Sequence, residues 1–247
     1  MRSARLFARP VLWVALVFAA LVLRMEAVGP ILGDWFPGVA PVVYDRASFL
    51  SLLLSQAGLV ATASGTAAAV GVGLAIFVTR SSGREFRAMV TALAAAGQSF
   101  PPAAVLAIAV PIVGFGAAPT VIALFLYGLL PIVENAVAGL EGVPPAVEDA
   151  AAGMGLSPAQ RLLVVELPLA APLILAGIRV SVTIAIGTAT IGATVGALTL
   201  GTPILDGLVA NNLPFVIEGA VLAALFAILA DLLLAGLDRW LRRHQVA

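Results

Sequence analysis

The chain has 247 residues, of which 62% are hydrophobic and 11% are charged. A soluble domain is about 45–50% apolar and about 25% charged, so this composition indicates an integral membrane protein. The formal net charge of +0 argues against a nucleic-acid-binding protein, and the absence of cysteine excludes disulfides and thiol chemistry. All 13 basic residues are arginine, and because the G-x-x-x-x-G-K-[ST] phosphate loop needs a lysine, any use of ATP has to come from a partner.

Six membrane-spanning helices are expected, because a span needs about 20 apolar residues. A short interfacial piece that ends near residue 55 precedes the second span. The long apolar stretch 88–133 holds two spans, which the turn-forming cluster 114–119 separates. In chain order, the expected spans lie at about residues 11–23, 56–79, the first and second parts of 88–133, 167–198 and 213–237.

The pair Pro101-Pro102 falls within the third expected span. Proline interrupts the backbone hydrogen bonds of a helix, and interrupted spans often border a transport pathway. A simple kink, and a span that begins only at Pro101, are alternatives that the sequence leaves open.

The first span has a rival interpretation, because Arg2, Arg5 and Arg9 before a short apolar run resemble a signal peptide. The run ends in Leu23-Arg24-Met25-Glu26, which offers no small-residue cleavage site. An uncleaved span is therefore expected.

The arginines predict the orientation of the chain, because cytoplasmic loops of membrane proteins are rich in basic residues. Only Arg24 and Arg46 lie on one side of the expected spans, and Arg179 falls inside the fifth. Both termini are therefore expected in the cytoplasm. The ten arginines on that side are Arg2, Arg5, Arg9, Arg80, Arg84, Arg87, Arg161, Arg239, Arg242 and Arg243.

No soluble domain is visible along the chain. We expect an N-terminal span with an external loop over residues 1–46, a membrane core over 47–240, and a cytoplasmic tail over 241–247. The core contains the largest cytoplasmic segment, a loop at 139–167, which is too short to fold alone and needs other surfaces to pack on.

The residues of this loop predict a short helix that lies between proline and glycine boundaries. Pro145 suits a first helical turn, where Glu148 and Asp149 complement the helix dipole. Gly155 can end the helix in a left-handed conformation, and Ser157-Pro158 can begin a second helix. An amphipathic connector without further function is the simplest interpretation of these features alone.

The spacing of the loop residues matches a known motif. Bacterial permeases of ATP-binding-cassette (ABC) importers carry a loop written E-A-A-x3-G-x9-I-x-L-P, and this chain resembles them here. Asp149 replaces the motif's Glu, although Glu148 adjoins it, and Val165 replaces Ile. The resemblance implies that eight residues couple this chain to an ATPase, namely Glu148, Asp149, Ala150, Ala151, Gly155, Val165, Leu167 and Pro168.

Further segments are similar to permeases that import osmoprotectants such as glycine betaine, carnitine and choline. The similarity extends over about residues 56–231. Glu134 stands where a basic residue is expected, and 196–201 replaces a more glycine-rich run. The similar segments are 124–135, 166–172, 176–179, 186–190 and 219–221.

The resemblance implies an all-α membrane protein with about six spans, the type I ABC importer permease fold and a cytoplasmic coupling helix. It implies a transport subunit that moves a quaternary ammonium compound, without catalytic residues, cofactor or metal of its own. The implied partners are two ATPase subunits, a second identical or different permease, an extracytoplasmic substrate-binding protein and the lipid bilayer, but no nucleic acid. Two alternatives remain, an importer of amino acids or other small polar solutes, and a self-sufficient secondary transporter.

Two further sets of residues within the spans are candidate functional residues. Arg179 and Asp231 are expected at similar depth on antiparallel spans and can form an ion pair, although each can instead snorkel to the interface. Thr188, Gly192 and Gly196 mark a small-sided face of span five. This face either lines the transport pathway or a permease–permease contact, or it serves plain helix packing.

Overall fold

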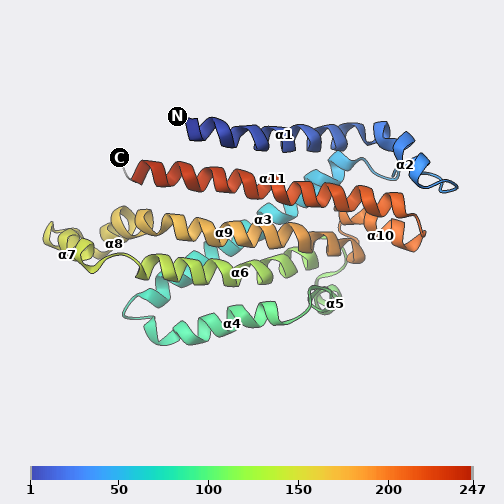
Figure 1. The fold of residues 1–247 in the computed structure, drawn as a ribbon. Coiled ribbons are helices and arrows are strands. Elements are labelled where there is room, and N and C mark those ends of the chain that lie inside the picture. Colours follow the sequence, from blue (N-terminus) through green and yellow to red (C-terminus); the bar gives the residue numbers. More distant parts are fainter. Residues whose placement is uncertain (1, 246–247) are drawn as a thin grey trace. The chain divides into compact units, whose positions relative to one another are not determined.

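The computed structural model describes the backbone of residues 2–245 and the side chains of residues 11–239. Within that range the chain is helical throughout, with turns between the helices and no strand (Figure 1). The arginine side chains expected at the two cytoplasmic ends lie outside the described ones, except for Arg239. The helices, in chain order, are α1 Arg2–Arg24, η1 Met25–Val28, α2 Gly29–Trp35, α3 Phe49–Thr79, η2 Arg84–Phe86, α4 Arg87–Ser99, α5 Pro102–Val113, α6 Ala117–Glu141, α7 Pro145–Gly153, α8 Pro158–Arg161, η3 Leu162–Glu166, α9 Leu167–Ile191, η4 Gly192–Val195, α10 Gly201–Val209 and α11 Leu213–Gln245.

Helix length and composition support the predicted number of spans. Five segments of the described chain are long and apolar enough to cross a membrane, and a sixth is obtained if the bent pair α4 and α5 counts as one span. The bend at this break is 95°. Phe100 and Pro101 are both extended there, as expected because each precedes a proline, and Pro102 is the first residue of α5.

Two predicted helix boundaries are wrong. Helix α3 is continuous over 31 residues, so no separate interfacial piece ends near residue 55. The Oγ atom of Ser48 accepts a hydrogen bond from the N–H of Ser51 at 3.2 Å and so caps the start of α3. Helix α9 ends at Ile191 rather than near 198, because η4 follows it and Gly196 then takes a left-handed conformation with φ of 83°.

The chain divides into two compact units. The first comprises residues 1–63, 101–124 and 183–233. Its core contains Phe18, Tyr44, Phe49, Phe215 and Leu222, all of them buried. In this unit the N–H of Gly116 donates to the carbonyl of Val195 at 2.7 Å, and both Gly114 and Gly116 have positive φ, which confirms the predicted turn between α5 and α6.

The second unit comprises residues 64–100, 125–182 and 234–247. Its core lies where α3, α4, α6 and α9 pack together, around Ala75, Val133, Ala136 and Ala170. A Cβ atom on Gly177 would lie 2.6 Å from the carbonyl oxygen of Pro131, so α9 approaches the backbone of α6 closely at this point. This packing holds the base of α9, from which the loop with α7 extends.

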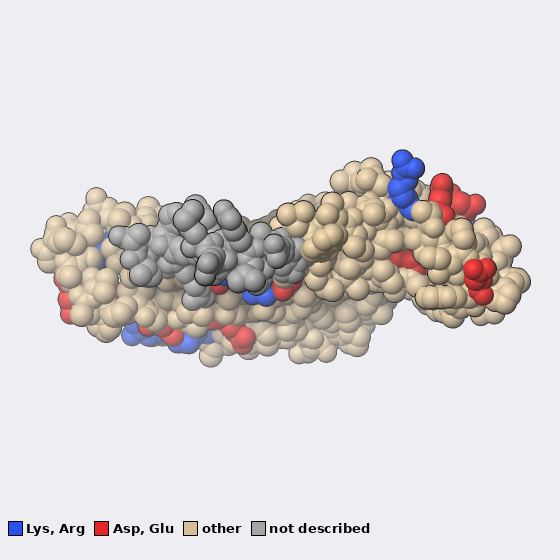
Figure 2. Space-filling view, turned by 45° about the horizontal axis from the view of Figure 1, so that its top comes forward, with Lys and Arg blue, Asp and Glu red and all other residues tan. Residues whose placement is uncertain are grey.

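Large apolar side chains are also exposed along the long helices. Trp13 on α1, Ile112 on α5 and Val209 on α10 are among them. In Figure 2 most of the described surface in view carries no Lys, Arg, Asp or Glu. Such a surface is suited to contact with lipid or with other membrane helices, as the composition predicts.

Candidate functional site

The predicted helix in the loop is present as α7, with the expected boundaries. Pro144 is extended and Pro145 is the first helical residue. At the other end Gly155 has φ of +81° and its N–H donates to the carbonyl of Ala152 at 2.9 Å. The N–H of Leu156 donates to the carbonyl of Ala151 at 3.2 Å. These two bonds form a Schellman cap, which needs a residue that tolerates a left-handed conformation.

The second predicted helix, α8, begins with a capping box. The N–H of Ser157 donates to Oε1 of Gln160 at 2.8 Å, while the N–H of Gln160 donates to Oγ of Ser157 at 3.4 Å, with Pro158 at the first position. Helix α8 packs beside α7 (Figure 1). The two caps therefore hold α7 and α8 as separate, well-defined helices.

The chain continues from α8 through η3 into α9 without a break at Pro168. The irregularity lies earlier, in η3, which is a π-helical turn over Leu162–Glu166. Pro168 is the second residue of α9, so its ring would collide with the carbonyl of Val164 in a regular helix. A π turn at this point relieves that collision.

The coupling residues predicted from the motif do not all lie at the surface. Asp149, Ala150 and Gly155 are exposed, Glu148 is half-buried, and Ala151 is only 1% exposed. Ala151 therefore packs against this chain, and the expectation that it contacts a partner directly has no support in its position. Of the remaining predicted residues, Pro168 is exposed, while Val165 and Leu167 are half-buried.

Sequence reasoning missed one large apolar residue on this surface. Met154 at the end of α7 is 74% exposed, next to the small residues Gly153 and Gly155. Methionine is flexible and polarisable, and it suits a contact surface. Its isolation within a run of small residues was the available indication.

Two ion pairs lie close to the loop, and sequence reasoning missed both. Arg80 forms a two-pronged pair with Glu166, and Arg87 forms a pair with Glu141. The hydrogen bonds that the Arg80 guanidinium donates to Glu166 raise the pKa of Arg80. Both arginines had served only to predict orientation. The acids at 141 and 166, each at an end of an apolar stretch, were the available indication of partners.

The first unit contains a polar network that sequence reasoning also missed. The Tyr44 hydroxyl donates to Oδ2 of Asp206 at 3.0 Å, and Arg46 lies 3.2 Å from the same oxygen. The N–H of Tyr44 donates to Oε2 of Glu218 at 2.9 Å. Burial, and then the bond to Asp206, raise the pKa of Tyr44 to about 12. The network pins the loop before α3 onto α10 and α11.

The small-sided face predicted on span five is not formed. Gly192 is buried, and a Cβ atom there would lie 2.6 Å from Cγ2 of Thr120. Gly196 ends η4, so the two glycines do not share a helical face. Thr188 is half-buried, whereas Gly187 and Thr183 are the exposed residues of this part of α9.

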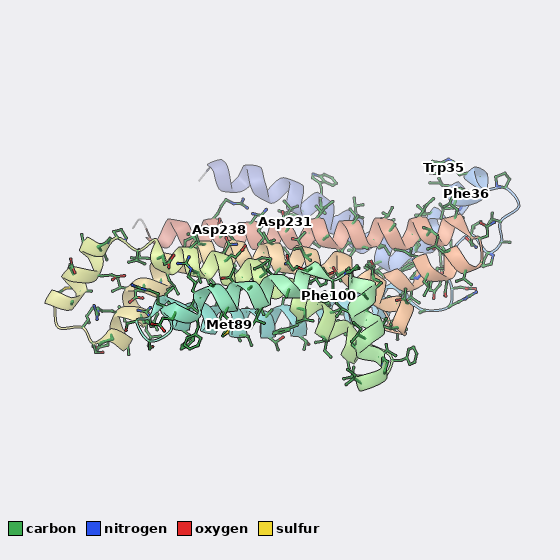
Figure 3. The ribbon with its side chains drawn as sticks, turned by 90° about the horizontal axis from the view of Figure 1, so that it is seen from below. Trp35, Phe36, Met89, Phe100, Asp231 and Asp238 are labelled. Carbon is green, nitrogen blue, oxygen red and sulfur yellow. The ribbon has the colours of Figure 1, made fainter. Side chains whose placement is uncertain are left out.

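The two ionisable residues predicted within late spans lie on different helices. Arg179 is on α9. Asp231 is on α11, as labelled in Figure 3. Their pairing stays a prediction.

Comparison with known proteins shows the family of this chain, and the matched region includes the loop. Residues 71–243, which include α7 and its flanking helices, match the family described as binding-protein-dependent transport system inner membrane component. The chain belongs to this family. An osmoprotectant import permease protein, OsmY of Salmonella typhimurium, is 40% identical to this inner membrane component over 212 residues, which are 86% of this chain and 90% of that protein.

Other relatives and a solved structure agree with this assignment. The glycine betaine/carnitine/choline transport system permease protein OpuCD of Bacillus subtilis is 39% identical over 174 residues, which are 70% of this permease and 75% of that protein. The MetNI methionine ABC transporter, in an inward facing conformation, contains a chain with a TM-score of 0.69 at 18% identity. The match covers 78% of this permease and 95% of that chain. The predicted all-α importer permease fold is confirmed.

Proposed function

We propose that this permease moves a quaternary ammonium osmoprotectant, such as glycine betaine, choline or carnitine, into the cell. The observation that carries the proposal is the 40% identity with an osmoprotectant import permease over 86% of the chain. This similarity extends through the predicted coupling loop and the spans on both sides of it.

Energy has to come from a separate ATPase subunit. Because the chain contains no lysine, it cannot form a lysine-dependent phosphate loop. The exposed residues of α7 and its cap, Asp149, Ala150, Met154 and Gly155, supply a small surface on which an ATPase subunit can dock. Two ATPase copies, a second permease and an extracytoplasmic binding protein complete the proposed complex.

The geometry of the loop supports a mechanism for coupling. If an ATPase subunit binds ATP more tightly in one arrangement than in another, ATP binding favours that arrangement. A helix docked on the ATPase, here α7, then changes position with it. Helix α7 begins at a proline and is capped at its C-terminal end, so it moves as a unit rather than unfolding. Because α8, η3 and α9 follow with no interruption, a displacement of the loop is passed to a membrane span.

The orientation required by this mechanism places the loop and both termini in the cytoplasm. The distribution of arginines supports it, because ten of the 13 fall on the side of this loop. Among the described ones, Arg80 and Arg87 pair with acids near the loop.

The proposal is tested with the reconstituted complex. The permease is co-purified with its ATPase and binding-protein partners and placed in proteoliposomes with ATP available to the ATPase. We expect uptake of labelled glycine betaine, choline or carnitine that needs ATP and survives collapse of ion gradients. Uptake of methionine alone would contradict the substrate class. Uptake driven by an ion gradient without ATP would contradict the importer assignment.

A further inference from the structure

A partly buried ion pair joins the residue after α3 to the last residue of η3. Nη1 of Arg80 donates to Oε1 of Glu166 at 3.1 Å, and Nη2 donates to Oε2 of the same carboxylate. The Glu166 side chain is only 7% exposed. Both carboxylate oxygens are therefore held by one planar guanidinium, which fixes the orientation of the two groups as well as their separation.

The pair acts at the joint between the loop and the membrane span. Glu166 ends the π turn of η3, and α9 begins at the next residue. A π turn is an irregular point in a helix, and such turns often occur at functional positions. Arg80 ties this joint to the end of α3, which is a separate span.

A second acid acts on the same arginine from the helix in the loop. The charge of Glu148, which is half-buried in the first turn of α7, adds to the effect of Glu166 in raising the pKa of Arg80. Nε of Arg80 is buried and has no hydrogen-bond partner among the described residues. Asp149, the next residue along α7, is exposed instead. The two adjacent acids thus face different surroundings.

We propose that Arg80 is a positioning residue for transport, which holds Glu166 at the joint between the loop and α9 and attracts the half-buried Glu148 of α7, so that movement of α7 reaches α3 and α9 together. The inference rests on the proposed function, because it assumes that an ATPase moves α7. It gives the two acids different roles: the half-buried Glu148 acts within this chain through its attraction to Arg80, and the exposed Asp149 is left for the partner.

The first test compares two arginine pairs of the same loop region. Arg80→Gln removes the pair with the buried Glu166, and Arg87→Gln removes the exposed pair with Glu141, whose side chains are 47% and 44% exposed. Substrate uptake and ATP hydrolysis are measured in the same proteoliposomes, and their ratio is the readout. We expect at least a fivefold fall in the ratio for Arg80→Gln and less than a twofold change for Arg87→Gln. Equal ratios for the two variants would overturn the proposal.

A charge swap keeps the test decisive if the single variant folds poorly. Arg80→Glu combined with Glu166→Arg restores opposite charges at the joint, and we expect it to recover at least half of the lost ratio. If neither the single variants nor the swap inserts into the membrane, the pair is only structural and the proposal fails. A wild-type complex that shows no ATP-driven uptake would instead overturn the proposed function.

The second test separates the two acids of α7 with a double-mutant comparison. Glu148→Gln should lower the ratio, and combined with Arg80→Gln it should add little, because both changes remove one connection. Asp149→Asn should lower the amount of ATPase that co-purifies with the permease. When Asp149→Asn is combined with Arg80→Gln, the fold-changes of the two single variants in the ratio of uptake to ATP hydrolysis should multiply. Full additivity of Glu148→Gln with Arg80→Gln would overturn the role given to Glu148.

Discussion

Single residues of the loop differ in what a substitution there would test. Gly155 has a positive φ, yet a Cβ atom at this position would meet nothing within 4 Å. A larger side chain there strains the backbone without any clash. Gly153 also has open space around its Cβ position but lies within α7 with ordinary helical geometry. Substitutions at these two glycines therefore distinguish the effect of backbone strain from the effect of side-chain size.

We predict that Gly155→Val abolishes transport and weakens ATPase co-purification, while the protein still inserts into the membrane. A left-handed conformation costs an ordinary residue about 1–2 kcal/mol, and a β-branched one more, so the cap of α7 is lost. Gly155→Asn should retain most uptake, because asparagine tolerates this conformation, and Gly153→Ala is the control. Normal uptake by Gly155→Val would show that the cap is not needed for docking.

Tyr44 allows a prediction on stability and its pH dependence. Tyr44→Phe removes the hydrogen bond from the hydroxyl to Asp206 and should lower the free energy of unfolding by about 1 kcal/mol. Tyr44→Ala also removes the packing of the ring on Phe215 and should lower it by about 3–5 kcal/mol. The pKa is raised from 10.0 to about 12, so the neutral phenol's contribution is complete below pH 10 and is lost as pH rises to 12. Thermal unfolding in detergent should show this loss in the wild type but not in Tyr44→Phe.

At the scale of helices, one buried side chain connects three segments of the first unit. Gln56 on α3 is fully buried. Its Nε2 donates to the carbonyl of Ile186 on α9 at 3.0 Å, and its Oε1 accepts from the N–H of Leu200, just before α10, at 2.8 Å. One N–H of the irregular backbone between α9 and α10, that of Leu200, is therefore satisfied by a side chain from another span.

We predict that Gln56→Leu destabilises the permease although leucine has a similar volume. The substitution leaves the buried N–H of Leu200 without its partner, at about 1–3 kcal/mol, and removes a further bond to the carbonyl of Ile186 in α9. The midpoint of thermal unfolding should fall by several degrees, and the neighbouring half-buried position provides Ser55→Ala as a control. An unchanged midpoint for Gln56→Leu would mean that water or another group replaces the amide.

The helices that sequence reasoning predicted well are those whose ends are set locally. Pro145, Gly155 and Ser157 bound α7 and α8 as expected, because proline, glycine and capping serine act within one or two turns. The turn at 114–119 was predicted for the same reason. The loop motif also lies where its spacing indicated.

What the sequence did not predict depends on contacts between distant residues. The Arg80–Glu166 and Tyr44–Glu218 contacts join positions 86 and 174 residues apart, and no periodicity within one helix indicates them. Gly192 and Gly196 match a helix-packing pattern, yet contact with Thr120 and a left-handed turn decide their geometry. Likewise, the burial of Ala151 follows from packing that the motif does not encode.

At the scale of the whole chain, orientation in the membrane is the property that the arginines predict most directly. The described structure supplies five spans, or six with the bent pair α4 and α5. An even number of spans returns the chain to the side on which it began. The two termini then share a side with the loop that contains α7.

We predict that a reporter fused after Ala247 and active only in the cytoplasm is active. A reporter inserted near Asp206, at the external end expected for α10, should be exposed outside the cytoplasm. The expected pattern follows from the arginine distribution, and accessibility to a membrane-impermeant label checks it independently. The reverse pattern at both sites would refute the six-span topology.

The π turn of η3 has a consequence for the direction in which the loop faces. A π turn holds one residue more than the α-helical turn that it replaces, and an α-helix rotates by about 100° per residue. The extra residue is therefore taken up within one turn, and α7 and α8 keep nearly the angular phase about the axis of α9 that a regular helix would give them. Loss of one residue from 162–166 would convert the π turn into an α-helical turn with little rotation of the Asp149 surface, and would bring the ring of Pro168 against the carbonyl four residues before it. Loss of one residue from the regular part of α9 would instead turn that surface by about 100°, away from a partner whose own position is fixed by the rest of the assembly.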